Sequence, residues 1–253
     1  MPISVEIINQ LSDNYSYLIY CNKDNSSIII DPAESEKILN VLKEKKLNLN
    51  YIFITHHHSD HTSGVADLVE AYPKVKVFSP SKLNSISVNV ISDGNKIITN
   101  LNEFEIIHTP GHTLDHIVLY DLKNNLLFVG DVLFRLGCGR VFEGTLEQMH
   151  NSLIKLLDLP DRMLVYCGHE YTLNNLKFLE HVFKKNKILE IAKKNVIADV
   201  NSKKRSVPFY LGDEKKCNPF LNQNCEMALK FKIKNNYSDF EFFRYLRQEK
   251  DSF

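Results

Sequence analysis

Residues 55–64 read THHHSDHTSG, a stretch in which His56, His58, Asp60 and His61 form the pattern H-x-H-x-D-H. The stretch follows NYIFIT, an apolar run with the length and the β-branched and aromatic content of a buried strand. Loops past the carboxyl ends of buried strands present ligands to a crevice in α/β sheets. In an extended segment His56 and His58 project to one side, whereas Asp60 and His61 fall where the chain turns into the next helix. The stretch therefore predicts two groups of ligands, each able to face its own metal ion.

Three more candidate ligands occupy similar places, since His112 in TPGHT, Asp131 in VGD and His169 in YCGHEY each follow a run with strand character. The candidates together are five histidines and two aspartates, N and O donors that suit zinc, iron(II) or manganese. One tetrahedral zinc ion would leave three of these ligands idle. Two metal ions use all of them, with Asp131 as the bridge, because a carboxylate has two oxygens and a neutral imidazole has one free lone pair. The remaining histidine of the first stretch, His57, is expected to point away and to serve in packing or in support of the ligands.

The first part of the chain alternates short apolar runs with turns. Nine runs have the length and composition of strands: 4–10, 15–21, 26–31, 50–55, 75–79, 103–108, 116–121, 126–131 and 163–168. Helical periodicity appears at 65–72 and at 145–157, where Thr145 is a candidate N-cap. Strands with helices spread among them indicate a mixed α and β domain.

The composition changes after Glu170. Residues 174–195 predict one long amphipathic helix, 208–220 predict a loop, and two further helical patterns follow at 226–233 and 238–250. This part predicts a helical appendage, and its small size does not indicate a unit that folds by itself.

Composition narrows the class of protein. With 253 residues, 43% hydrophobic and 25% charged, the chain has ordinary globular proportions. No run approaches the ~18 apolar residues of a membrane span, and the N-terminus lacks the features of a secretory or transit signal. Five cysteines without framework spacing favour reduced thiols. We therefore expect a cytoplasmic protein without membrane attachment.

The motifs resemble those of the metallo-β-lactamase superfamily and, within it, glyoxalase II, the hydroxyacylglutathione hydrolases. THHHSDHTSG, TPGHT and FVGD are similar to the superfamily's metal motifs, whereas GCGRVFEG, GHEYTLNNLKF, NPF and the terminal RQEKDSF look like glyoxalase II. The resemblance covers essentially the whole chain. It implies an α+β fold, the αββα sandwich with a C-terminal helical domain, divided here as a catalytic domain at 1–172 and a helical substrate-binding domain at 173–253.

The resemblance also implies the roles of particular residues. It implies a first metal ion on His56, His58 and His112, a second on Asp60, His61 and His169, and Asp131 with a solvent hydroxide between them. Two divalent ions per chain are expected, zinc first, with iron or manganese as alternatives, and Asp60 and Asp131 as the catalytic residues. It implies that glutathione contacts Arg140, Tyr171, Arg247 and Lys250. Arg140 stands where the family often has lysine, and Phe142 where it often has tyrosine, so Phe142 is left out of the binding set.

The implied reaction is hydrolysis of S-D-lactoylglutathione and related S-2-hydroxyacylglutathiones, the second step of methylglyoxal detoxification, by a hydroxide bound to both metal ions. The partner is then a small glutathione thioester, and neither nucleic acid nor membrane; a monomer is favoured. An excess of basic residues in 171–253, 17 Lys and Arg against 10 Asp and Glu, suits such an anionic ligand. Alternatives are another hydrolase of this fold, such as a lactonase, lactamase or nuclease, a mononuclear-iron persulfide dioxygenase, or a protein with a structural metal. A nuclease should carry an extended basic surface, and structural zinc favours cysteine ligands, which the cluster lacks.

Overall fold

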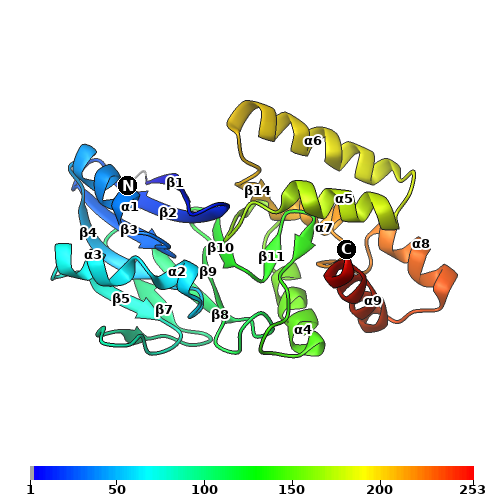
Figure 1. The fold of residues 1–253 in the computed structure, drawn as a ribbon, viewed down its shortest axis with the longest axis horizontal. Helices are drawn as coiled ribbons and strands as arrows, with labels where there is room; N and C mark the ends of the chain where they lie inside the picture. Colours follow the sequence, from blue (N-terminus) through cyan, green and yellow to red (C-terminus); the bar gives the residue numbers. More distant parts are fainter. Residues whose placement is uncertain (1–2) are drawn as a thin grey trace.

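A computed structural model describes residues 3–253, so the first two residues of the predicted catalytic domain lie outside it. Two six-stranded sheets face each other in the first part of the chain, and helices form the C-terminal part (Figure 1). The first sheet has the strand order β1-β2-β3-β4-β5-β6: β1 (Ser4–Gln10), β2 (Asn14–Tyr20), β3 (Ser26–Ile30), β4 (Asn48–Phe53), β5 (Lys76–Ser79) and β6 (Asn89–Val90).

The second sheet has the order β14-β13-β10-β9-β8-β7: β7 (Lys96–Ile98), β8 (Glu103–His108), β9 (Ile117–Asp121), β10 (Leu126–Gly130), β13 (Leu164–Cys167) and β14 (Phe209–Tyr210). A small antiparallel hairpin of β11 (Leu133–Phe134) and β12 (Gly137–Cys138) follows β10. β10 pairs with β13 in parallel, so the carboxyl ends of both strands lie at the same edge of the sheet.

The core has two parts because each sheet is apolar on both faces. Strand residues such as Leu18, Ile29 and Ile52 pack under α1 (Glu36–Glu44) and α3 (Val65–Ala71), and this forms the outer cluster of the first sheet. Their neighbours along the same strands point the other way and join the second sheet in one larger cluster, which also takes in α4 (Leu146–Leu157) and the C-terminal helices. The layers are therefore helix, sheet, sheet and helix, and the predicted αββα sandwich is confirmed.

The C-terminal part is helical, as predicted, with five helices in the described chain: α5 (Thr172–Val182), α6 (Lys187–Lys203), α7 (Leu211–Cys217), α8 (Glu226–Asn235) and α9 (Asp239–Ser252). These helices lie together at one end of the molecule, on the right in Figure 1. The larger core cluster runs through both parts of the chain, from Leu127 of β10 to Phe242 of α9. The division between 172 and 173 stays a prediction.

Two predictions for the C-terminal part were wrong. The single helix at 174–195 is two helices, because the chain leaves the helical path at Phe183 and Lys185 has a positive φ of 57°. Asn186 then caps α6 by accepting hydrogen bonds from the backbone of Ile188 and Leu189. The predicted loop at 208–220 holds β14 and α7, since β14 pairs with β13.

Other local predictions were confirmed. Thr145 caps α4 in a capping box with Gln148. The five cysteines are free and buried, as expected for reduced thiols. α1, the short α2 (Ser59–Thr62) and the strands β6, β7, β11 and β12 were not predicted. Over residues 3–253, no helix combines the length and the apolar character needed to cross a membrane.

Candidate metal centre

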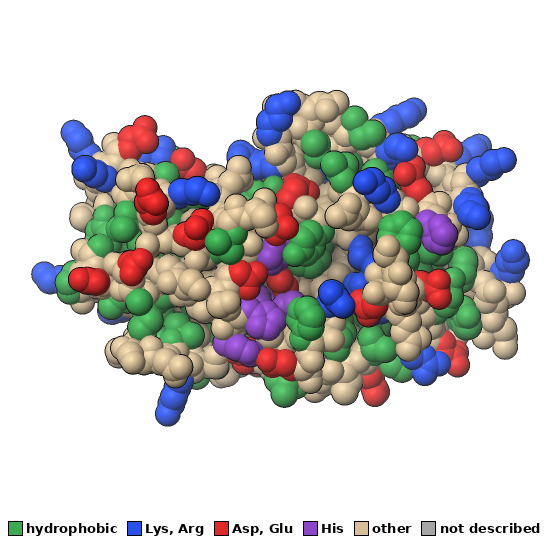
Figure 2. Space-filling view, viewed as in Figure 1, with side chains coloured by type: hydrophobic (Ala, Val, Ile, Leu, Met, Phe, Trp, Pro, Cys, Tyr) green, Lys and Arg blue, Asp and Glu red, His purple; other side chains and the backbone are tan. Residues whose placement is uncertain are grey.

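The predicted ligands lie together where four strands end. β4 leads into the stretch with His56, His58, Asp60 and His61, and α2 begins inside that stretch. His112, Asp131 and His169 follow β8, β10 and β13, all in the second sheet. The cluster therefore lies between the two sheets, and Figure 2 shows histidine side chains gathered in the middle of one face of the molecule.

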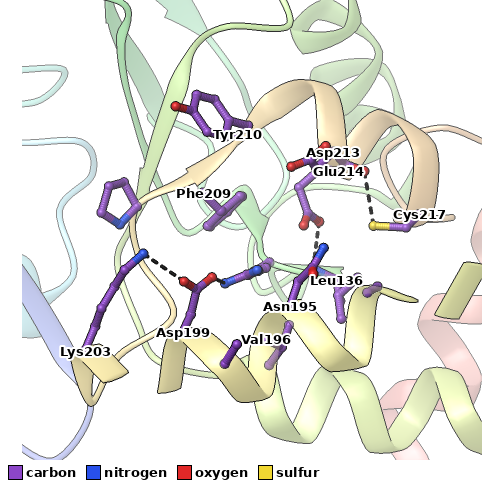
Figure 3. A pocket seen from close by; sticks show the side chains of 14 residues that line it. Leu136, Asn195, Val196, Asp199, Lys203, Phe209, Tyr210, Asp213, Glu214 and Cys217 are labelled. Atoms are coloured by element: carbon purple, nitrogen blue, oxygen red, sulfur yellow. Dashed lines mark hydrogen bonds and ion pairs between the residues drawn. The ribbon is translucent and has the colours of Figure 1, made fainter. Parts of the chain in front are cut away.

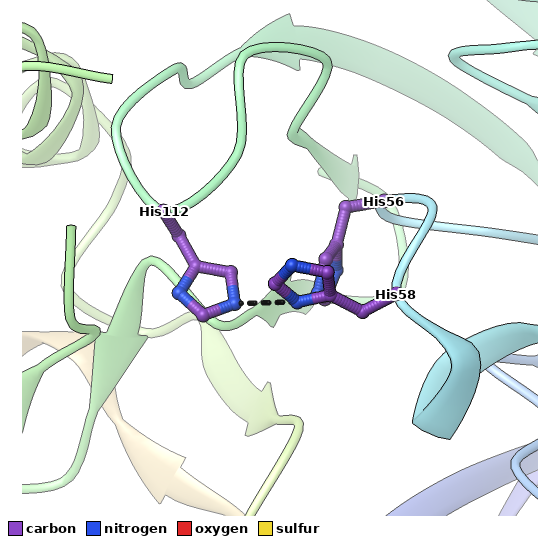
Figure 4. A group of neighbouring side chains, drawn as sticks. All are labelled: His56, His58 and His112. Carbon is purple, nitrogen blue, oxygen red and sulfur yellow. Dashed lines mark hydrogen bonds between the residues drawn. The ribbon is translucent and has the colours of Figure 1, made fainter. Parts of the chain in front are cut away.

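The first group is made of His56, His58 and His112 (Figure 4). The Nδ1 atom of His58 lies 3.1 Å from Nε2 of His56 and 3.1 Å from Nε2 of His112. Burial and the neighbouring histidines lower the pKa of all three imidazoles, which keeps the rings neutral. Neutral rings whose nitrogens converge in this way offer lone pairs to a shared cation.

The second group is made of Asp60, His61 and His169. The Nε2 atom of His169 lies 3.3 Å from Asp60 Oδ2, and Nε2 of His61 lies 3.8 Å from the same oxygen. His61 Nε2 is buried without a hydrogen-bond partner among the described residues. Buried polar atoms are normally paired, so this nitrogen is suited to a ligand that the protein itself does not supply.

Asp131 lies between the two groups. Its Oδ2 atom is 3.4 Å from Nε2 of His112 and 3.2 Å from Nε2 of His169, and its Oδ1 atom is 3.6 Å from Nε2 of His61. Burial raises the pKa of Asp131, but His61 and His169 outweigh it and hold the pKa below its usual range. In the described chain Oδ1 is also a buried atom without a hydrogen-bond partner. One ionised carboxylate thus reaches both groups.

The backbone comes close to this carboxylate at Gly168. A Cβ atom on Gly168 would lie 2.2 Å from Asp131 Oδ1 and 2.8 Å from Cε1 of His61. Any larger residue would displace the Asp131 side chain. The glycine of the GHE motif therefore allows the backbone to pass close to Asp131 and His61.

A cavity of about 510 Å³ opens from the cluster toward the C-terminal helices. The four predicted glutathione contacts, Arg140, Tyr171, Arg247 and Lys250, all line it. The ring of Tyr171 stacks on His169, with 4.8 Å between the ring centroids. Arg140 is exposed, and its guanidinium lies 5.5 Å from the centre of the Phe142 ring. The cavity thus joins the cluster of candidate metal ligands to basic and aromatic side chains.

Lys250 and Arg247 differ in how far hydrogen bonds within the protein already occupy their charged groups. Lys250 donates a hydrogen bond to Asn175 Oδ1, and burial together with the charge of Arg247 lowers its pKa to about 8. Arg247 is only 1% exposed. Its Nη1 donates to the carbonyls of Cys138 (3.0 Å) and Gly139 (3.3 Å), and its Nη2 donates to Asp251 (3.0 Å). Arg247 therefore holds the backbone behind the cavity, and its predicted direct contact with glutathione stays a prediction.

Comparison with known proteins agrees with this geometry. The model of the metallo-beta-lactamase superfamily matches residues 11–169, and the model of the hydroxyacylglutathione hydrolase C-terminus matches residues 170–253. A hydroxyacylglutathione hydrolase of Pectobacterium atrosepticum is 38% identical over 250 residues, covering 97% of this chain and 98% of the relative. One of Photorhabdus laumondii is 39% identical, again covering 97% and 98%. The chain belongs to the hydroxyacylglutathione hydrolase family.

Solved structures with this fold are more distant in sequence. ETHE1 from Myxococcus xanthus superposes with a TM-score of 0.65 at 24% identity, covering 97% of this chain and 96% of that one. The B3 metallo-beta-lactamase BLEG-1 superposes with a TM-score of 0.64 at 22% identity, covering 86% and 99%. These likenesses concern the fold alone, so the assignment to the hydroxyacylglutathione hydrolases rests on the sequence matches.

Two carboxylates that the sequence analysis did not single out lie behind the candidate ligands of this family member. Asp13 Oδ1 makes a 2.8 Å hydrogen bond with Nδ1 of His169, whereas Asp31 Oδ2 lies 3.0 Å from Nδ1 of His61 as a charge contact without hydrogen-bond geometry. A carboxylate on the far nitrogen fixes the orientation of a ligand imidazole. Asp31 ends the apolar run at 26–31, the same signal that marked Asp131, and could have been found. Asp13 precedes a strand and had no such signal.

The histidine after the TPGHT motif has a supporting role as well. His116 is fully buried, and its Nε2 accepts a hydrogen bond from the backbone of Asp131 (3.0 Å). Burial lowers the pKa of His116 to about 3, so the ring is neutral and can accept. His116 therefore fixes the backbone that carries the central carboxylate.

Proposed function

We propose that this protein hydrolyses the thioester bond of S-D-lactoylglutathione and related S-2-hydroxyacylglutathiones, which releases the 2-hydroxy acid and glutathione. The observation that carries the proposal is the cavity that joins the histidine and aspartate cluster to basic side chains of the C-terminal part. The nearly full-length match to hydroxyacylglutathione hydrolases supports the same reaction. In the cell this is the second step of methylglyoxal detoxification.

The cluster fits two divalent metal ions, zinc first, with iron or manganese as alternatives, because its donors are imidazole and carboxylate. The first ion would bind His56, His58 and His112, and the second Asp60, His61 and His169. Asp131 would bind both. When bound, such ions supply a hydroxide at neutral pH and a Lewis acid for the thioester carbonyl.

Asp60 is suited to orient the attacking oxygen. Hydrogen bonding from His169 lowers its pKa well below the usual range, and its Oδ2 accepts a hydrogen bond from Asn14 (3.0 Å). Asp60 also lines the cavity. A carboxylate held in this way can accept a hydrogen bond from the nucleophile without taking its proton away at neutral pH.

The basic residues of the cavity suit the peptide part of the substrate. Glutathione carries two carboxylates, and Lys250 and Arg140 are cationic donors in the same cavity as the cluster. Tyr171 and Phe142 add aromatic surface beside the histidines. We also assign Arg247, whose guanidinium lines the back of this cavity, to the residues that contact glutathione.

A monomer stays the proposed functional unit. Five free, buried cysteines support a cytoplasmic location, where thiols stay reduced.

One experiment tests the function against its alternatives. The purified protein should hydrolyse S-D-lactoylglutathione and contain about two metal ions per chain, measured as zinc, iron and manganese. Asp131→Asn serves as the control for the cluster. Wild-type protein that is loaded with metal but inactive on glutathione thioesters would contradict the proposal. Activity on a lactone or on nucleic acid, or oxygen consumption with one iron per chain, would identify which alternative holds.

A further inference from the structure

His57 faces away from the metal cluster and lies between two carboxylates. Its Nδ1 atom is 2.9 Å from Asp115 Oδ1, and its Nε2 atom is 3.0 Å from Glu143 Oε1. Its side chain is 41% exposed, whereas its neighbour His56 is fully buried. The ring therefore connects three loops that are far apart in the sequence: the stretch after β4, the turn before β9 and the loop before α4.

Both carboxylates also accept hydrogen bonds from other parts of the chain. Asp115 accepts hydrogen bonds from the hydroxyls of Ser81 (2.6 Å) and Thr113 (2.7 Å). Glu143 Oε2 accepts a hydrogen bond from the backbone of Leu114 (2.9 Å). These hydrogen bonds help to hold the carboxylates on either side of the imidazole, and we call the ring with its two carboxylate contacts the strut.

Glu143 lies in the segment that forms one wall of the substrate cavity, through Arg140 and Phe142. We call residues 139–144 the wall loop. Within it the backbone N–H groups of Phe142 and Glu143 both point at the carbonyl of His112, at 3.2 and 3.3 Å. The Phe142 ring lies edge-on to His112 with 5.1 Å between centroids. Phe142 is 59% exposed, so few side-chain contacts hold it and its place depends on the backbone of the wall loop.

We propose that His57 is a positioning residue that ties the wall loop to the metal-binding stretch and so shapes the part of the cavity that receives the peptide of the substrate. This inference rests on the proposed function for the identity of the substrate. His57 binds neither the metal ions nor the substrate in this role. It acts through Glu143 on Phe142 and Arg140, which line the cavity.

The same contacts suggest a competing role. Ligand atoms of His57, His58 and Glu143 lie within 4.8 Å of one another and could hold a cation. Metal content distinguishes the two roles, because a strut can be removed without changing the number of bound ions.

The experiment compares His57→Ala, His57→Gln and Glu143→Ala in the metal-loaded enzyme. His181→Ala, an exposed histidine on α5, is the matched control. For His57→Ala we expect KM for S-D-lactoylglutathione to rise about threefold to tenfold, the effect of losing one partly exposed hydrogen bond to Asp115 and the ion-pair contact with Glu143. The kcat should stay within about twofold and the metal content should not change. His57→Gln should recover part of the loss, since its amide can still donate one hydrogen bond.

Two further measurements separate positioning from general damage. A thioester of N-acetylcysteamine lacks the γ-glutamyl and glycyl groups, so its kcat/KM should be the same in wild type and in His57→Ala. The double variant of His57→Ala and Glu143→Ala should be no worse than Glu143→Ala alone, because Glu143→Ala already removes the contact between the two side chains together with the hydrogen bond from Leu114.

Hydrogen exchange gives a readout that does not depend on activity. The amides of Leu114, Phe142 and Glu143 should exchange faster in His57→Ala than in wild type or in His181→Ala. Unchanged exchange at these amides, an unchanged KM, or loss of a metal ion from His57→Ala would each overturn the inference. If the wild type itself does not hydrolyse glutathione thioesters, the proposed function fails, and hydrogen exchange still decides whether His57 is the strut.

Discussion

Replacing Glu214 by glutamine should stabilise the protein at and above neutral pH. Glu214 lies in α7 and is 2% exposed. Its Oε2 atom accepts hydrogen bonds from the backbone of Leu136 (2.7 Å) and from Asn218 (3.0 Å), as Figure 3 shows for the first. Glutamine has the same shape and keeps an acceptor at this place. Its amide group would face a cavity of about 320 Å³, which has room for water.

The size of the effect follows from the pKa. Burial raises the pKa of Glu214 from 4.5 to about 7, against the lowering effects of the Leu136 amide and the charge of Arg135. Between these two values the unfolded chain loses the proton while the folded chain keeps it, so the free energy of unfolding falls as pH rises. Above pH 7 the cost is at most about 3 kcal/mol, at ~1.36 kcal/mol for each pKa unit. For a chain of this size that is at most about 6 to 12 °C in Tm.

Thermal unfolding at pH 5, 6, 7 and 8 measures this cost. Glu214→Gln should differ little from wild type at pH 5 and should melt several degrees higher at pH 8. Glu190→Gln, on the exposed side of α6, controls for the loss of one negative charge. Metal loading affects all three proteins alike and cancels in the difference. If the curves of Tm against pH run parallel for wild type and Glu214→Gln, the carboxyl is not strained by burial and the reasoning is refuted.

Three further variants test the site. Asp131→Asn should lower the metal content and reduce turnover more than about a hundredfold, beyond the effect of losing an outer partner of a metal ligand; near-normal turnover with one ion per chain would contradict the bridge. Lys250→Met should raise KM about tenfold. The wild-type KM should also climb as pH passes about 8, where Lys250 loses its charge, whereas the KM of the variant should not change over this pH range. Arg247→Ala leaves the carbonyls of Cys138 and Gly139 unpaired, so urea unfolding should show a loss of about 2 kcal/mol besides a higher KM; a higher KM at unchanged stability would indicate direct contact with substrate.

The ligand cluster could be predicted because its signals are local. An apolar run followed by a histidine or aspartate marks a strand exit, and such exits meet at one edge of a sheet. Within the described chain, the groups His56, His58 and His112 and Asp60, His61 and His169 form as the family resemblance implied. Their roles as metal ligands remain for the metal measurements to test.

The rest depends on contacts between distant parts of the chain. Nothing in the letters 174–195 breaks the helix, which contains neither proline nor glycine, and only Asn186 could have indicated a new N-cap. The pairing of β14 with β13 and the hydrogen bond of Arg247 to Cys138 of β12, 109 residues earlier, are set by how the helices pack. Periodicity within one segment carries no information about such partners.

The two ligand groups draw on both sheets, and this has a consequence for the order of events during synthesis. The stretch after β4 leaves the ribosome early with four potential donors, but His112, Asp131 and His169 belong to the second sheet and follow much later. Neither group is complete until its late member has been made, and the last of these is residue 169 of 253. A nascent chain thus carries only part of each ligand group, so a metal ion that needs the whole group would bind fully only after the two sheets have come together. Metal binding by this cluster would then be a late step of maturation, and a chain whose second sheet misfolds would lack both complete ligand groups.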